Sequence, residues 1–308
     1  MLRAYGRIAL RSLELWIWTI LFLVVLSIPL VLTAGKLASR ETRAQLLAGT
    51  LPFDSAWWLP LAATAVVAAL LGTQIARRRD RVSWETTGLR RQGALRDMSI
   101  GLGIGLLSFA LVPLTAALLG WGHLAAGDLG TTMIPGLLIA FTSFLAFSAF
   151  EEITSRGLVF ALLAGRSPAA AVCVTSLFFA LMHAPNNGFD LLSFVGVLAS
   201  GAALAVARLR SGALWLPIGW HLGWNFSQGS IFGCSVSGLH PPETTLMISR
   251  LDGPVSAVGG EFGPESGLLA TFATLLTVWA YARFTSGTEA TREESQRQAD
   301  PPIRPETP

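Results

Sequence analysis

Two adjacent carboxylates lie in the middle of a long apolar stretch of this 308-residue chain. Glu151 and Glu152 follow an apolar run rich in phenylalanine, and Arg156 comes four residues after Glu152. Ionised carboxylates rarely persist in hydrocarbon without a partner or a task, because burying an unpaired charge is costly. Residues four apart share one helix face, so Glu152 and Arg156 are expected to form an ion pair. That ion pair leaves Glu151 free for chemistry. An open alternative is that both glutamates only form ion pairs with arginines.

Two histidines and an asparagine lie in later apolar stretches of the chain. His183 closes one of these stretches, and His221 and Asn225 lie four residues apart in another, on one helix face. We counted residues from the turns expected between these helices, at about 1.5 Å of rise per helical residue. The count puts all three side chains at about the depth of Glu151. The sequence therefore predicts that four polar side chains from three helices converge.

A carboxylate, two imidazoles and a carboxamide suit the attack of water on a carbonyl group. Glu151 is expected to take a proton from water, while a neighbouring histidine orients that water or relays the proton. Donors from a histidine and from Asn225 can hold the oxyanion of a tetrahedral intermediate. Serine proteolysis is less attractive, because Ser155 and Ser227 do not lie in a Gly-x-Ser-x-Gly turn.

Metal ligation is a second use for the same side chains. The sequence has no His-Glu-x-x-His pair, but Glu151 (or Glu152), His183 and His221 would together supply three zinc ligands. Asn225 is a poor zinc ligand and a good oxyanion donor, which favours a site without a metal. We therefore expect no cofactor, with zinc as the alternative.

The surrounding sequence is that of an integral membrane protein. Only 13% of the residues are charged, the mean hydropathy is +0.56, and several apolar runs reach about 20 residues, the length that spans a bilayer as a helix. The chain is predicted to be an all-α, polytopic bundle of about eight transmembrane helices around a buried polar cavity. The predicted spans are 14–35, 57–76, 98–121, 131–163, 168–184, 189–207, 213–232 and 266–284.

The positive charges indicate an orientation for these spans. The net charge of +3 does not indicate nucleic-acid binding, because the arginines are dispersed through short connections. Placing both termini in the cytoplasm puts most arginines on that side and leaves only Lys36, Arg40, Arg43 and Arg250 opposite. The first apolar run is too long for a usual secretory signal and is expected to be a retained helix. A bacterial cell membrane is the expected location.

Four segments follow from this organisation. Residues 1–130 hold N-terminal helices and a basic cytoplasmic loop, 131–232 the candidate catalytic helices, and 233–284 an external loop and the last helix. The polar tail 285–308 is expected to be disordered.

Two further features concern single residue types. Three glycines on one helix face are expected to allow close packing against another helix. Two histidines in predicted external connections are expected at the surface. These residues are Gly101, Gly103 and Gly105, and His123 and His240.

Three motifs together resemble the CAAX prenyl endopeptidase and bacteriocin-processing (CPBP, Abi-like) family of intramembrane proteases. The motifs Glu-Glu-x-x-x-Arg, Phe-x-x-x-His and His-x-x-x-Asn are matched, in order, by Glu151, Glu152 and Arg156, by Phe179 and His183, and by His221 and Asn225. The resemblance covers residues 131–232. It implies that Glu151 and His183 activate water, that His221 and Asn225 stabilise the oxyanion, and that Glu152 and Arg156 shape the site.

The leading hypothesis is an intramembrane endopeptidase that acts on a membrane-associated or lipidated peptide or protein. Nothing in the sequence identifies a prenyl pocket. One alternative is a non-catalytic adaptor or bacteriocin-immunity protein that keeps the polar cluster for folding or partner recognition. Proton-coupled transport is a third possibility, since intramembrane carboxylates and histidines also form relays, but the chain shows no internal repeat.

Overall fold

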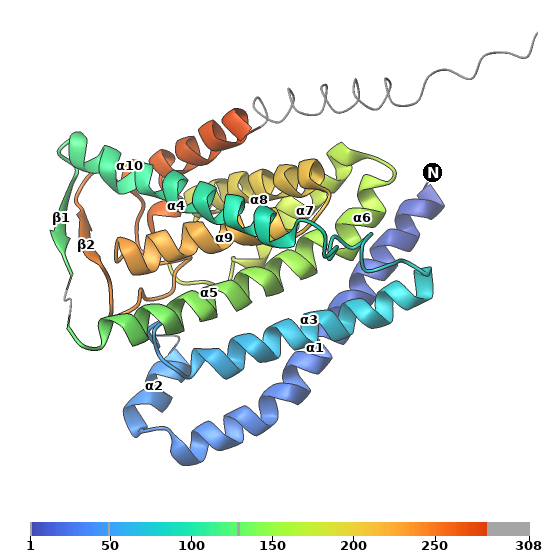
Figure 1. The fold of residues 1–308 in the computed structure, drawn as a ribbon, viewed down its shortest axis with the longest axis horizontal. Helices are drawn as coiled ribbons and strands as arrows, with labels where there is room; N and C mark the ends of the chain where they lie inside the picture. Colours follow the sequence, from blue (N-terminus) through green and yellow to red (C-terminus); the bar gives the residue numbers. More distant parts are fainter. Residues whose placement is uncertain (1, 49, 128–129, 282–308) are drawn as a thin grey trace, which may run out of the picture.

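The computed structural model describes residues 2–48, 50–127 and 130–281 (Figure 1). Nearly all of the regular structure is helical. The helices are α1 Leu2–Leu37, α2 Arg40–Ala48, α3 Trp58–Asp80, α4 Ala94–Leu118, α5 Met133–Arg156, α6 Leu158–Ala164, α7 Pro168–Met182, α8 Leu191–Ser211, α9 Trp215–Phe226, α10 Val255–Val258 and a further apolar helix, Leu268–Tyr281. A π-helical turn, η1 (Ser227–Ile231), continues α9, and a 3-10 turn, η2 (Pro264–Ser266), precedes the last helix.

Five helical stretches are long and apolar enough to cross a membrane, which makes this an integral membrane protein. They are Ile8–Leu37, Trp58–Arg79, Ala94–Leu118, Met133–Ala164 and Leu191–Ser211. Each of the other predicted spans also contains a helix, but α7, α9 and Leu268–Tyr281 are shorter. The all-α polytopic bundle is therefore confirmed, whereas the count of eight spans is not. The predicted tail, 285–308, lies outside the described residues.

The predicted span 131–163 consists of two helices, because the chain breaks at Gly157. This residue has φ −81° and ψ −112°, outside the helical region. The carbonyl oxygen of Arg156, left over by the break, accepts a hydrogen bond from Nε of Arg208 at 3.2 Å. The break ends α5 at Arg156 and lets α6 pack separately.

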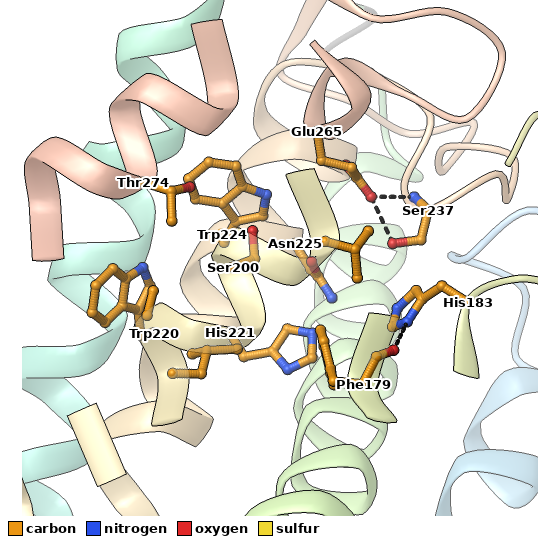
Figure 2. Close-up of a pocket in the computed structure, with 13 residues that line it drawn as sticks. Phe179, His183, Ser200, Trp220, His221, Trp224, Asn225, Ser237, Glu265 and Thr274 are labelled. Atoms are coloured by element: carbon orange, nitrogen blue, oxygen red, sulfur yellow. Dashed lines mark hydrogen bonds between the residues drawn. The ribbon is translucent and has the colours of Figure 1, made fainter. Parts of the chain in front are cut away.

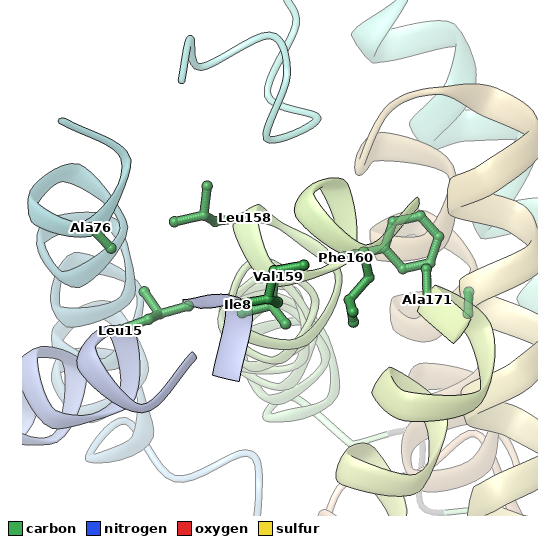
Figure 3. Packing of buried hydrophobic residues seen from close by; sticks show 9 residues of the cluster. Ile8, Leu15, Ala76, Leu158, Val159, Phe160 and Ala171 are labelled. Carbon is green, nitrogen blue, oxygen red and sulfur yellow. The ribbon is translucent and has the colours of Figure 1, made fainter. Parts of the chain in front are cut away.

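Helix α5 lies at the centre of the bundle, between α3 and α9 (Figure 1). Helix α1 packs mainly on α3 at the edge of the molecule, and its outer face carries many exposed apolar side chains, as expected for contact with lipid. One end of this edge is closed by Ile8 and Leu15 of α1, which pack with residues of α3, α6 and α7 (Figure 3).

Helices α4 and α9 cross at very close range because both present glycines. A Cβ atom on Gly101 or Gly105 would overlap the α9 backbone, and one on Gly219 or Gly223 would overlap that of α4. The predicted packing role of the glycine face is thus seen at two of its three positions. Gly103 points away, with no described atom within 4 Å of its Cβ position. The crossing fixes α9, which carries two candidate site residues.

The predicted external loop of 233–265 is folded rather than extended. Strand β2 (Met247–Leu251) pairs antiparallel with β1 (Gly122–Ala126), so that Gly122 lies opposite Leu251 and Ala126 opposite Met247. The carboxylate of Asp54 accepts hydrogen bonds from the backbone amides of Glu243 and Thr244. The loop therefore covers one end of the bundle. His123 and His240 are exposed there, as the sequence predicts.

Candidate active site

The structure brings Glu151 of α5 to two imidazole rings from two other helices. Its Oε2 atom lies 3.9 Å from Nε2 of His183, at the end of α7, and 3.9 Å from Nε2 of His221, in α9. The Glu151 side chain is 30% exposed, so solvent can reach it, yet Oε2 itself is buried and has no hydrogen-bond partner among the described residues. These three groups surround a gap that a water molecule can bridge.

Backbone structure fixes the tautomer of His183. Its Nδ1 atom lies 2.8 Å from the carbonyl oxygen of Phe179, one turn earlier. A carbonyl oxygen only accepts, so Nδ1 carries the proton and donates it. In the neutral ring the lone pair of Nε2 then faces Glu151.

A buried ion pair orients His221. Glu152 and Arg156 are fully buried and paired at 2.8 Å, as their spacing predicts. The same oxygen of Glu152 lies 3.1 Å from Nδ1 of His221, a contact that helical spacing alone does not predict. Nδ1 of His221 therefore donates to the carboxylate and Nε2 faces Glu151, which resembles the carboxylate–histidine arrangement of many enzyme sites.

Arg156 in turn connects α5 to neighbouring elements. Its guanidinium donates to the carbonyl oxygen of Gly201 in α8 at 3.1 Å and lies over the ring of Phe179, 4.2 Å from the centroid. Phe179 also contacts the rings of His183 and His221. The supporting residues named by the sequence thus pack around the imidazoles.

Asn225 lies one turn beyond His221 and lines a small cavity of about 50 Å³. Figure 2 shows its amide pointing toward the two imidazole rings. The cavity is walled by Trp220, Trp224 and aliphatic side chains, and its acidic lining residue is Glu265. All four candidate catalytic residues therefore lie around one site.

Two larger cavities lie on the Glu151 side of the site. The first, about 240 Å³, is lined by Glu151 and His183 and by residues of α1, α5 and α7. The second, about 360 Å³, shares Trp16, Thr154, Ser155 and Phe178 with the first and is almost wholly apolar. Together they extend from Glu151 toward α1 at the edge of the bundle.

The metal alternative fits this geometry poorly. Among the described residues no group of three His, Cys, Asp or Glu side chains is placed to hold a metal ion. Glu151, His183 and His221 thus do not form a ready ligand set.

Several polar residues around the site were missed by sequence reasoning. Gln228 and Glu265 are buried beside the cavity that Asn225 lines, and Ser237 hydrogen bonds to Glu265. Glu265 falls in a stretch rich in glycine, proline and serine, which predicts an external loop. Gln228 lies one turn after Asn225 in a predicted span, a position that could have drawn attention.

Comparison with known proteins agrees with the motifs. Residues 132–227 match the family model described as type II CAAX prenyl endopeptidase Rce1-like. We call this matched stretch the Rce1-like segment, because it is similar to that family. The Rce1-like segment contains every candidate catalytic and supporting residue, and the match supports a CAAX-type intramembrane protease at the level of the family. No curated protein and no solved structure matches the chain.

Proposed function

We propose that this protein is an intramembrane endopeptidase that hydrolyses a peptide bond with water activated by Glu151 and His183. The observation that carries the proposal is the position of Glu151 Oε2, 3.9 Å from both Nε2 atoms. One water at a hydrogen-bond distance of about 2.8 Å from these atoms fits such a gap. Its oxygen would be the nucleophile.

In the first step, Glu151 takes a proton from the water as the water oxygen attacks the scissile carbonyl carbon. The C=O π electrons move to oxygen and give an oxyanion. Asn225 Nδ2–H and His221 Nε2–H stabilise it. His221 must be an imidazolium for this role, because its Nδ1 proton already goes to Glu152; the carboxylate of Glu152 stabilises that charge. Collapse of the intermediate then breaks the C–N bond, and the proton held by Glu151 passes to the leaving nitrogen, directly or through His183.

The cavities support a substrate that comes from the bilayer. The apolar cavity beside α1 leads to the one that Glu151 lines, and α1 itself is only lightly buried against the rest of the bundle. An apolar segment or lipid chain would pass there at little desolvation cost. We infer a membrane-associated or lipidated peptide or protein as substrate, in a cell membrane with both termini of the enzyme in the cytoplasm.

Mass spectrometry of membrane peptides tests this proposal. Cells that carry the native protein should contain cleaved peptides that are missing from cells with Glu151→Ala, and the identity of these peptides gives the cleavage site. Repeating the comparison with chelator reports whether a metal is needed. Identical peptides in both cell lines, with both proteins folded in the membrane, would exclude the mechanism. A non-catalytic adaptor would instead keep its biological activity in Glu151→Gln.

A further inference from the structure

Glu265 is a buried carboxylate outside the Rce1-like segment. Its side chain lines the cavity that also contains His183, His221 and Asn225, and the residue is only 6% exposed. Oε1 accepts hydrogen bonds from the backbone amide and from the hydroxyl of Ser237, both at 2.6 Å (Figure 2). Oε2 accepts a hydrogen bond from the side-chain amide of Gln228. Three donors thus converge on one carboxylate, an arrangement that stabilises a buried charge.

One side of this arrangement leads to Asn225. Gln228 is fully buried in η1, one turn after Asn225. Its Oε1 atom accepts from the indole of Trp224 at 2.9 Å, and its Nε2 atom donates to the carbonyl oxygen of Ser235 at 2.6 Å as well as to Glu265. The hydrogen bonds with Trp224 and Ser235 fix the orientation of the Gln228 side-chain amide, so that its NH2 group faces Glu265.

The other side leads to His183. The carbonyl oxygen of Ser237 accepts a hydrogen bond from the side-chain Nδ2 of Asn186 at 2.8 Å. The backbone amide of Asn186 donates to the carbonyl oxygen of His183 at 3.0 Å. Ser237 has φ of +49°, a left-handed conformation that costs a non-glycine residue energy and that its surroundings must hold in place. The hydrogen bonds that Ser237 forms with Glu265 and Asn186 keep its backbone in this conformation.

We propose that Glu265 is a positioning residue of the proteolytic site, which ties the segment after His183 to the segment after Asn225 and so fixes both side chains at the scissile carbonyl. The inference rests on the proposed function. Catalytic hydrogen bonds need positional precision, since a displacement of about 1 Å can cost roughly 100-fold in rate. Glu265 acts through Ser237 and Gln228 and is not itself a catalytic residue.

Glu265→Gln is the substitution that tests this link between Ser237 and Gln228 with the least other change. The new side chain keeps the size of glutamate, and its oxygen can still accept from Ser237. Its NH2 group, however, meets the NH2 of Gln228, which cannot turn over without losing its bonds to Trp224 and Ser235. The link to η1 is therefore broken while the volume is kept. Glu261→Gln is the matched control, because Glu261 lies in the same loop and is exposed.

Kinetics in proteoliposomes provide the first readout, with a fluorogenic peptide built on the cleavage site found by mass spectrometry. Glu265→Gln should lower kcat by about 10- to 100-fold and leave KM within about twofold, because the substrate still binds but the reacting groups are displaced. Glu261→Gln should behave as the unchanged protein. Wild-type kcat in folded Glu265→Gln would overturn the proposal.

A second readout needs no activity. Cys234 is 7% exposed, and its backbone amide donates to the carbonyl oxygen of Gln228 at 2.9 Å, so its thiol reports on this end of the loop. With the exposed Cys173 replaced by alanine, maleimide labelling of Cys234 should become severalfold faster in Glu265→Gln but not in Glu261→Gln. Unchanged labelling would overturn the tie, even if kcat fell. A separate measurement tests the proposed function itself. Cleavage at the wild-type rate by folded Glu151→Gln would contradict that function, whatever the result for Glu265→Gln.

Discussion

Adjacent glutamates in α5 have different chemical surroundings, although they have the same side chain. Glu152 is fully buried, paired with Arg156 and bonded to His221, whereas Glu151 is partly exposed and its Oε2 atom is not hydrogen bonded to any described residue. A carboxylate held by two strong partners orients its neighbours, and one without such partners can accept a proton from water. The difference follows from the helical turn of about 100° between successive residues.

Most of the site was predictable at this scale because helical spacing is regular. The pairs Glu152–Arg156 and His221–Asn225 follow from four-residue separations, and counting from turns places His183 near Glu151. The contact from His221 to Glu152 was not predictable, because it depends on how α9 rotates against α5. Glu265 was not predictable either, since its burial comes from folding of a loop that looks solvent-exposed in sequence.

The stability of the protein should depend on pH through Glu265, which lies before the last helix and outside the candidate spans. Burial raises the pKa of Glu265 from 4.5 to about 7, against the hydrogen bonds from Ser237 and Gln228, which lower it. Below pH 4.5 the carboxyl is neutral in both the folded and the unfolded protein, and its contribution to the free energy of unfolding is fully present. That contribution, on the order of 3 kcal/mol, is lost as the pH rises through about 7.

Melting curves in detergent check this dependence. The melting temperature of the unchanged protein should fall between pH 5 and pH 8 more steeply than that of Glu265→Gln, which cannot titrate at this position. Parallel curves for the two proteins would show that Glu265 has an ordinary pKa. Comparing slopes removes the constant effect of the substitution itself.

At the scale of elements, the crossing of α4 and α9 decides where His221 and Asn225 lie. Gly105 sits against the backbone of Trp220 and Trp224, and any side chain there must push the helices apart. Gly105→Leu should therefore destabilise the protein by at least the 1–3 kcal/mol or so typical of overpacking, and abolish cleavage. Gly103→Leu, on the same helix, points away from α9 and should be tolerated. Equal melting temperatures and activities for the two variants would contradict this role of the crossing.

The helices were predictable as elements, but their ends and breaks were less so. Apolar runs of about 20 residues located α1, α3, α4, α5 and α8, since length and hydropathy dominate in a bilayer. Hydropathy cannot show the break at Gly157, because the apolar residues of α6 directly follow α5 and read as a continuation of the same span. Hydropathy alone also does not separate shorter apolar helices such as α9 from full spans, so the count of eight spans stays a prediction.

At the scale of the whole molecule, the two cavities between α1, α5 and α7, of which the outer one is apolar, connect the site to the edge of the bundle. Val174 of α7 lines the apolar cavity, while Leu177, on the same helix, is similarly exposed but is not among its lining residues. Val174→Trp should fill the path and raise KM severalfold with little change in kcat, because the reacting groups are untouched. Leu177→Trp is the matched control. The same KM for both variants would show that substrate does not pass this cavity.

The account depends most on Glu151 acting as the base that activates water. Proteoliposomes with purified protein and its peptide substrate, in water enriched in ¹⁸O, measure that step directly. The unchanged protein should release peptides whose new carboxyl termini carry ¹⁸O, and Glu151→Gln, with the same melting temperature, should release none. Cleavage with ¹⁸O incorporation at the wild-type rate by folded Glu151→Gln would contradict the account.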